Sequence, residues 1–388
     1  MTRPAVLGGP CRFPAGLAFV RPSLPPLSEV TRRLGPSYAE GQVTDGPLVR
    51  ELEAAAAERL SVDHVVAVAS CTTGLMLVWK VLQPNGPVVL PGFTFAASAH
   101  ALDWNHVGLR FAECDPHSFQ IDSADAIAKL SGAAGVLATH VFGAPCDATA
   151  LQAAADQAGV PLVYDAAHAF GARLQGRPVG GLGTAEVFSL TPTKPLVAGE
   201  GGLVATRDAE LARQIRVGRN YGNPGDYDSQ FSGLNGRMSE FHAAVALASL
   251  ERFDEDLASR RGLAERYCNA VVGITGLQPQ AVPAGDTSTW KDFTVRVDEA
   301  EYGLNAGQAS DALRADGIDT RRYFWPPVHL HRAYRQRFPT RLPITEAAAG
   351  SVISLPVWPA MELSTVDTVI EVLGDLHDHA EEIRERVA

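Results

Sequence analysis

The chain has 388 residues, a mass of 41.2 kDa and a formal net charge of −11, with 46% apolar and 20% charged residues. This apolar share is too high for a disordered chain, and the acidic balance lacks the dense positive charge that binds nucleic-acid backbones. No apolar run approaches the roughly 18 residues of a membrane span, and the five cysteines stand in no metal-ligand spacing. We therefore expect a cytoplasmic globular protein of about two domains, without nucleic-acid, membrane or metal partners.

The N-terminal stretch differs from the rest of the chain. Residues 1–45 are rich in proline and predict an irregular arm that leans on the body of the protein. Arg12 and Arg21 also interrupt this stretch, which makes it a poor signal peptide. From Gly46 the pattern changes to a predicted helix over residues 47–60, with good helix formers and a proline near its start.

Short apolar segments then alternate with helical segments. Strands are predicted at residues 64–69, 88–90, 109–112, 135–140, 161–164, 187–190 and 202–206. Continuous apolar runs between helices are typical of a mostly parallel sheet that is covered on both faces. We therefore expect an α/β fold over residues 46–254, with ligands bound at the carboxyl ends of the strands.

The pattern shifts after about Asp254. A long polar helix leads to an alternating strand at 290–297, and an aromatic, proline-containing loop at 323–331 precedes a last helix from Ser364. This mixture predicts a smaller α+β domain over residues 255–388.

Only four lysines occur in the chain, which limits the candidates for chemistry that needs an amine. Lys80 and Lys129 fall on amphipathic helices, where solvated side chains are usual, and Lys291 falls in the alternating strand. Lys194 lies instead in a loop just after a strand, and Pro195 disfavours helical backbone at that position. Lys194 is thus the best candidate for a reactive amine, although a structural lysine is the commoner case.

Two further features lie at strand ends. Asp165 ends an apolar strand, where a carboxylate binds a pyridinium, a ribose or a metal, or simply caps the next helix. Ser70 to Thr73 close another strand and open a helix, which makes either an anion site or an ordinary helix cap. A phosphate site, a carboxylate at a strand end and a loop lysine together are the parts that a pyridoxal phosphate enzyme needs.

The motifs of the chain, in their order, resemble the DegT/DnrJ/EryC1/StrS family of fold-type I pyridoxal phosphate aminotransferases, which act on sugars. The resemblance runs from about Gly46 to Pro359 and rests on GPLVRELE, ASCTTGLML, PGFTFAASAHAL, HVFGAPCD, YDAAHAFGA, EVFSLTPTKPLVAGEGGLVAT, RNYG, GLNGRMSEFHAAVALASLE, TRRYFWPPVHLHRAY and SLPVWP. It implies an aspartate aminotransferase-like fold, in which helices sandwich a mostly parallel sheet and a smaller C-terminal domain follows.

The same resemblance implies roles around the cofactor ring. Lys194 would form the Schiff base with pyridoxal 5′-phosphate, and Asp165 would pair with the pyridine nitrogen. His168 would lie near the phenolic oxygen, and Phe95 would stack on the ring. The structural alternatives are a helix-face histidine and a core phenylalanine.

Further implied contacts concern the cofactor phosphate. Thr72 and Thr73 would bind it through backbone and hydroxyl groups, with help from Ser189. Asn235 would reach the phosphate of the neighbouring subunit, so that a homodimer would share its active sites; a plain turn residue is the alternative for Asn235.

Substrate contacts are predicted from the need to bind a nucleotide diphosphate and a sugar. The candidate cations are Arg219, Arg237 and Arg321. Tyr323 and His329, in the aromatic loop, are candidates for contacts with the sugar. Ordinary surface positions are the alternative for all five.

The implied reaction is a ping-pong transfer of an amino group from L-glutamate to a keto sugar. The resemblance is greatest to antibiotic-pathway enzymes that aminate C4 of a dTDP-4-keto-6-deoxyhexose. Three alternatives stay open: a cyclitol ketone such as scyllo-inosose, a non-catalytic regulator that keeps the fold, and a nicotinamide-dependent enzyme. The sequence lacks the Gly-x-Gly-x-x-Gly pattern, which argues against the last of these.

Three departures from the family bear on the choice of substrate. Pro195 removes a backbone donor just after the lysine. Asp45-Gly46 stands close to the expected substrate, where Asn-Gly or Ser-Gly is common. The N-terminal arm fits the relatives poorly.

Overall fold

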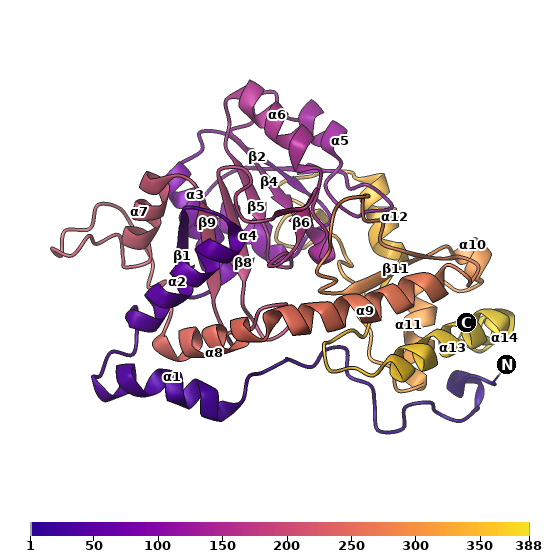
Figure 1. Cartoon of the computed structure of the whole chain (residues 1–388). Coiled ribbons are helices and arrows are strands. Elements are labelled where there is room, and N and C mark those ends of the chain that lie inside the picture. Colours follow the sequence, from indigo (N-terminus) through magenta and orange to yellow (C-terminus); the bar gives the residue numbers. More distant parts are fainter. Residues whose placement is uncertain (1, 388) are drawn as a thin grey trace.

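A computed structural model describes residues 2–387, and a seven-stranded sheet forms the centre of the molecule (Figure 1). In spatial order its strands are β1 (His64–Val68), β9 (Gly202–Thr206), β8 (Ala185–Ser189), β5 (Leu162–Asp165), β4 (Gly135–Thr139), β2 (Val88–Pro91) and β3 (Leu109–Ala112). Every strand predicted for this part of the chain is present, and no predicted end differs from the observed one by more than two residues.

The strand directions bring one set of strand ends together. The pairs β2–β3, β2–β4, β4–β5 and β5–β8 are parallel, and β9 is antiparallel to both β8 and β1. The prediction of an α/β fold with a mostly parallel sheet is therefore confirmed. Because β1 and β8 both run opposite to β9, they run in the same direction. The carboxyl ends of β1, β8, β5, β4 and β2 thus lie at the same end of the sheet.

Both faces of this sheet are buried under helices. Val65 of β1 packs into the cluster that contains α2 (Pro47–Leu60), whereas Val66 packs on the opposite face with α3 (Cys71–Leu82). Successive side chains of a strand point to opposite faces, so a strand buried on both faces shows a continuous apolar run. The other helices of this part are α4 (Ala96–Asp103), α5 (Ser123–Ala128), α6 (Ala148–Ala158), α7 (Ala209–Gly218) and α8 (Glu240–Glu251).

The C-terminal part contains a separate three-stranded antiparallel sheet. Its strands are β10 (Leu277–Pro279), β11 (Phe293–Val297) and β12 (Val352–Leu355). Its helices are α9 (Phe253–Val271), α10 (Glu299–Tyr302), α11 (Ala306–Ala315), α12 (Pro343–Ser351), α13 (Leu363–Asp378) and α14 (Ala380–Val387). The domain boundary between residues 254 and 255 falls inside α9 and stays a prediction.

A short hairpin of β6 (Arg173–Leu174) and β7 (Arg177–Pro178) was not predicted. None of the helices in residues 2–387 has the length and apolar character needed to cross a membrane.

The prediction of an irregular arm is wrong for residues 27–39, which form α1 (Leu27–Ala39) with Pro36 inside it. Val30 and Leu34 of this helix pack against the hydrophobic cluster that α2 and α8 share. Proline weakens a helix because it lacks an N–H donor, but burial of an apolar face stabilises the helix in compensation.

The residues before α1 run along the C-terminal part, so that the two ends of the chain lie side by side (Figure 1). The backbone amide of Thr2 donates to the carboxylate of Asp375 at 2.8 Å. Leu7 and Leu17 are buried in the hydrophobic cluster of the C-terminal sheet. The arm therefore contributes to the core of the C-terminal part.

Candidate functional site

A cavity of about 320 Å³ opens where the strand ends meet. The predicted site residues that line it are Thr72, Phe95, Asp165, His168, Ser189, Lys194 and Tyr323. The first six come from the carboxyl ends of strands of the central sheet or from the helices and loops that follow them, and the last comes from the C-terminal part. Folding thus brings together seven candidates that are scattered along the sequence.

Asp165 is the last residue of β5 and is almost fully buried. One of its carboxylate oxygens accepts a hydrogen bond from the hydroxyl of Ser98 at 2.7 Å, and the other accepts from the amide of Ala167 at 3.1 Å. Burial raises the pKa of this carboxyl, and the two hydrogen bonds oppose that effect because they favour the charged form. No helix follows β5, so the helix-cap alternative is wrong: the bond to Ala167 closes a turn, and the Asp165 side chain faces the cavity.

Lys194 lies in the loop after β8. Its amide donates to the carbonyl of Thr191 at 3.0 Å, and this turn presents the side chain to the cavity. Burial, followed by the positive charge of Lys291, lowers the pKa of the Lys194 amine to about 8. An amine with this pKa is partly uncharged near neutral pH, which suits a nucleophile or a base.

We expect amine-acylating reagents to modify Lys194 of the cofactor-free protein with a midpoint near pH 8. Only the uncharged amine reacts, so the labelling rate rises as the pH passes through the lowered pKa of about 8. A short lysine peptide in the same sample provides the control, with its midpoint at about pH 10.4. Mass spectrometry of the digested protein across a pH series gives both midpoints. Equal midpoints for Lys194 and the peptide would contradict the described environment.

The start of α3 is the candidate anion site. Ser70 caps the helix, because its hydroxyl oxygen accepts from the amide of Thr73 at 3.1 Å. Thr72 lines the cavity in the same first turn, where backbone N–H groups of a helix point toward a ligand. β9 can approach this turn closely because residue 202 is glycine: a Cβ atom there would lie 2.6 Å from the backbone of Ser70 and Cys71.

His168 is a neutral donor at the cavity wall. Its Nδ1 accepts a hydrogen bond from the amide of Phe142 at 3.1 Å. An accepting nitrogen carries no proton, so the proton of the neutral ring resides on Nε2. Burial and the charges of Lys194 and Lys291 hold the pKa of His168 well below its usual value, which keeps the ring neutral. Phe95 differs in being an exposed aromatic ring beside the cavity.

This set of residues fits pyridoxal phosphate. The cofactor has an aldehyde, a ring nitrogen, a phenolic oxygen, a flat ring and a phosphate. The cavity presents an amine (Lys194), a carboxylate (Asp165), a neutral N–H donor (His168), an exposed aromatic face (Phe95) and a helix N-terminus. Each chemical group of the cofactor therefore has a partner of the appropriate kind.

Lys291 lines the same cavity, although its sequence position suggested a structural residue in an alternating strand. The prediction of a strand over 290–297 is wrong for the first three residues, because β11 begins at Phe293. The amide of Lys291 donates instead to the carbonyl of Phe142 at 3.0 Å, which turns the chain toward the cavity. The Lys291 ammonium lies 2.6 and 2.8 Å from the two carboxylate oxygens of Asp292. A pattern of alternating polar and apolar residues does not predict such a turn.

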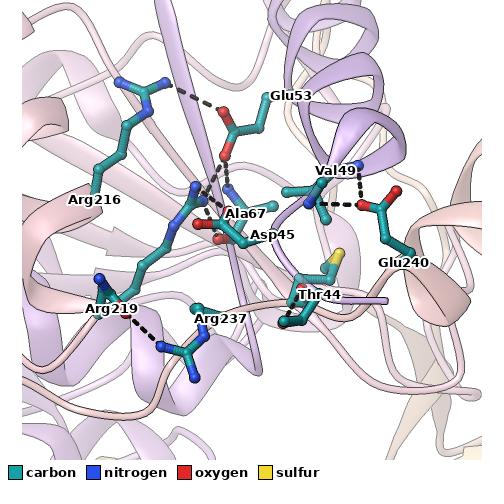
Figure 2. Close-up of polar contacts among 12 residues, drawn as sticks. Thr44, Asp45, Val49, Glu53, Ala67, Arg216, Arg219, Arg237 and Glu240 are labelled. Atoms are coloured by element: carbon teal, nitrogen blue, oxygen red, sulfur yellow. Dashed lines mark hydrogen bonds and ion pairs between the residues drawn. The ribbon is translucent and has the colours of Figure 1, made fainter. Parts of the chain in front are cut away.

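Arg219, a predicted substrate cation, lies outside the cavity lining and is already paired (Figure 2). Its guanidinium donates to Glu53 at 2.5 Å, to Asp45 at 2.6 Å and to the carbonyl of Ala67 at 2.6 Å. Glu53 also accepts from the amide of Ala67 at 2.9 Å. Because β1 is an edge strand, these two side chains satisfy outward backbone groups that no neighbouring strand pairs. These contacts suit a structural role for Arg219, and its contact with substrate stays a prediction.

The Asp45-Gly46 step departs from the family at Asp45, whose carboxylate accepts from Arg219 at 2.6 Å. The packing around Gly46 explains the glycine. Glu240 is fully buried, and its carboxylate accepts from the amides of Gly46 and Val49 at 2.9 and 3.0 Å (Figure 2). It thereby caps α2 from a distant part of the chain. A Cβ atom on residue 46 would lie 2.8 Å from the Glu240 carboxyl carbon, so this close approach requires glycine.

Asn235 and Arg237 also lie outside the cavity lining. Asn235 is exposed, and its backbone forms an isolated bridge with Asn220. The Arg237 guanidinium donates to the Asn220 side chain and lies 5.4 Å from the centre of the Tyr221 ring. The reach of Asn235 into a neighbouring subunit stays a prediction.

The last two substrate candidates have different surroundings. Arg321 is exposed, pairs with Asp319 and lies 5.2 Å from the centre of the Phe19 ring, which the N-terminal arm supplies. His329 is buried, and its Nε2 lies 3.3 Å from the carboxylate of Glu346. His329 thus belongs to the core and does not line the cavity that contains Lys194.

Sequence comparisons identify relatives across almost the whole chain. The model of the DegT/DnrJ/EryC1/StrS aminotransferase family matches residues 28–374. The UDP-N-acetyl-3-dehydro-alpha-D-glucosamine 3-aminotransferase of Acidithiobacillus ferrooxidans is 32% identical over 354 residues, which cover 89% of this chain and 94% of the relative.

Solved structures are similar over comparable lengths. DesI in the presence of its TDP-sugar product has a TM-score of 0.93 and 34% identity, and covers 98% of each chain. DesV of S. venezuelae in complex with a ketimine intermediate has a TM-score of 0.85 and 31% identity, and covers 91% of this chain and 95% of its own. The family model begins at residue 28, whereas the match to DesI covers 98% of this chain, so a poor fit of the N-terminal arm to the relatives stays a prediction.

Proposed function

The chain belongs to the DegT/DnrJ/EryC1/StrS aminotransferase family and is a pyridoxal phosphate-dependent aminotransferase, and we propose that it transfers the amino group of L-glutamate to a keto sugar carried on a nucleoside diphosphate. The observation that carries the proposal is the single cavity that holds both the Lys194 amine and the Asp165 carboxylate. The N-terminus of α3 supplies the phosphate site of the same cavity.

The residues that line the cavity have different roles in the proposed reaction. When bound, the cofactor supplies a pyridine ring that accepts electrons from the bond being broken. Lys194, with its pKa of about 8, accepts and returns protons at neutral pH. Asp165 stays ionised opposite the positive charge of a protonated ring nitrogen, because an opposite charge at short range favours the carboxylate. His168 donates from Nε2 to an oxygen of the ring.

We propose a 4-keto-6-deoxyhexose linked to thymidine diphosphate as the acceptor. The sequence motifs resemble those of C4 aminotransferases, and DesI, which matches 98% of this chain, has a TDP-sugar as its product. The relative from A. ferrooxidans, which acts at C3 of a UDP-linked sugar, supports a UDP-linked 3-keto sugar as the second candidate.

The test separates the donor from the acceptor. First, the holoenzyme alone is mixed with L-glutamate, and we expect release of one equivalent of 2-oxoglutarate per active site. Second, glutamate is supplied with TDP-4-keto-6-deoxyglucose, UDP-N-acetyl-3-dehydroglucosamine or scyllo-inosose, and the aminated product is identified by mass spectrometry. We expect kcat/KM for the TDP sugar to exceed the others by at least about 100-fold. Preference for another acceptor would replace the proposed sugar, and failure of the first step would contradict the glutamate donor.

We also propose that the enzyme works as a homodimer with shared active sites. Asn235 is exposed and lies outside the cavity of its own chain, which suits a residue that completes the phosphate site of a partner. Exposed aromatic side chains nearby, such as Tyr221 and Phe241, suit burial in a subunit contact.

A further inference from the structure

A chain of buried hydroxyl groups leads to the carboxylate of Asp165. The hydroxyl oxygen of Thr139 lies 2.9 Å from that of Thr94, which lies 2.8 Å from that of Ser98. The Ser98 hydroxyl lies 2.7 Å from Oδ2 of Asp165. None of these four residues is more than 6% exposed, so water does not compete for the hydrogen bonds.

The carboxylate determines which hydroxyl donates in each of these hydrogen bonds. An ionised carboxylate only accepts, so Ser98 must donate its single hydroxyl proton to Asp165. Ser98 therefore accepts from Thr94, and Thr94, having used its own proton, accepts from Thr139. Hydrogen bonds that point the same way polarise one another, which strengthens the last bond, to Asp165.

The hydrogen-bonded hydroxyls also connect different elements of the fold. Thr139 and Asp165 are the last residues of the neighbouring strands β4 and β5, whereas Thr94 and Ser98 lie on either side of the start of α4. Phe95 sits between Thr94 and Ser98 and is the residue that caps α4. The hydroxyls thus tie the segment that carries Phe95 to the strand ends that carry Asp165.

We propose that Ser98 and Thr94 are positioning residues. They hold the Asp165 carboxylate charged and oriented toward the cofactor ring, and they hold Phe95 where it stacks on the same ring. This proposal rests on the role proposed above for Asp165. Neither Ser98 nor Thr94 is required to touch the substrate; both act through Asp165 and Phe95.

Other groups near Asp165 also affect the pKa of its carboxyl group. Lys194 from the loop after β8 and His140 after β4 carry or gain positive charge near it, and the thiol of Cys71 at the start of α3 lies 3.9 Å away. The positive charges and the hydrogen bond from Ser98 all favour the ionised carboxyl. Loss of the Ser98 donor should therefore raise the pKa of Asp165 while the other groups stay in place.

The experiment measures the affinity of the full-length protein for pyridoxal phosphate between pH 5 and 8 by near-visible absorbance. We expect Ser98→Ala to weaken binding about tenfold, as for one lost hydrogen bond to a charged group, and to move the acid limb of the binding curve to higher pH. Thr94→Val, which keeps the size of the side chain, should have a smaller effect in the same direction. Thr94→Ser, which keeps the hydroxyl, should bind pyridoxal phosphate with wild-type affinity.

Asp165→Asn serves as the reference variant. If Asp165→Asn weakens binding strongly but neither Ser98→Ala nor Thr94→Val moves the acid limb, the positioning proposal is wrong and the role of Asp165 stands. If Asp165→Asn itself leaves binding unchanged, the role of Asp165 is wrong. Uniform weakening of binding by Ser98→Ala at all pH values would indicate a merely structural residue and would also overturn the proposal.

Discussion

Replacing Lys194 with alanine should abolish the near-visible absorption band that the protein develops with pyridoxal phosphate, and should lower the rate of amino transfer at least about 10³-fold. Lys194 has the only cavity amine that is not engaged by a carboxylate in the described structure, and loss of a positioned proton carrier typically costs about 10²–10⁴-fold. Absorbance spectra and the rate of 2-oxoglutarate release from glutamate measure the two effects.

The second cavity lysine provides the matched control. Lys291 is held by both carboxylate oxygens of Asp292, so Lys291→Met should keep the absorption band. It should raise the pKa of Lys194, because a neighbouring positive charge is removed. A band that survives in Lys194→Ala but disappears in Lys291→Met would transfer the catalytic role to Lys291.

Replacing Arg219 with methionine should lower the free energy of unfolding by about 3–5 kcal/mol, which is the usual cost of leaving one partner of a buried ion pair alone. The side chains of Arg219 and Glu53 are only 6% and 10% exposed, and Arg219 also bonds to the edge strand through Ala67. Urea-induced unfolding, followed by circular dichroism, measures the change.

An exposed ion pair on α7, the helix that Arg219 follows, is the control for this variant. Arg213 and Glu210 lie on the surface of α7, so Arg213→Met should change stability little. Adding Glu53→Gln to Arg219→Met should recover part of the loss, since it removes a buried charge whose remaining ionic partner, Arg216, lies 3.4 Å away. A loss below about 1 kcal/mol for Arg219→Met would mean that the network in Figure 2 does not stabilise the fold.

Much of the fold could be predicted because local sequence carries the relevant signals. The strands of the central sheet are continuous apolar runs between helices, and this pattern arises wherever both faces of a strand are buried. Parallel strands place their carboxyl ends together, so the positions of Asp165 and Lys194 after their strands were enough to predict a shared cavity. The scarcity of lysine and the presence of Pro195 then singled out Lys194.

Other features depend on partners that are far away in the sequence. Arg219 looked like a free cation, but Glu53, 166 residues away, binds it. Lys291 looked like a strand residue, but its backbone pairs with Phe142 of the other part of the chain. The helix at residues 27–39 contains a proline and becomes stable only where its apolar face packs against α2 and α8.

The sequence by itself therefore determined the strands, the mostly parallel sheet and the two residues proposed to carry the chemistry, because periodicity and strand-end position are local properties. Tertiary structure decided which charges are neutralised, which lysine joins Lys194 in the cavity, and that the hydroxyls of Thr94 and Ser98 converge on Asp165. These outcomes depend on distances between elements, and such distances are set by packing of the whole chain rather than by any one segment.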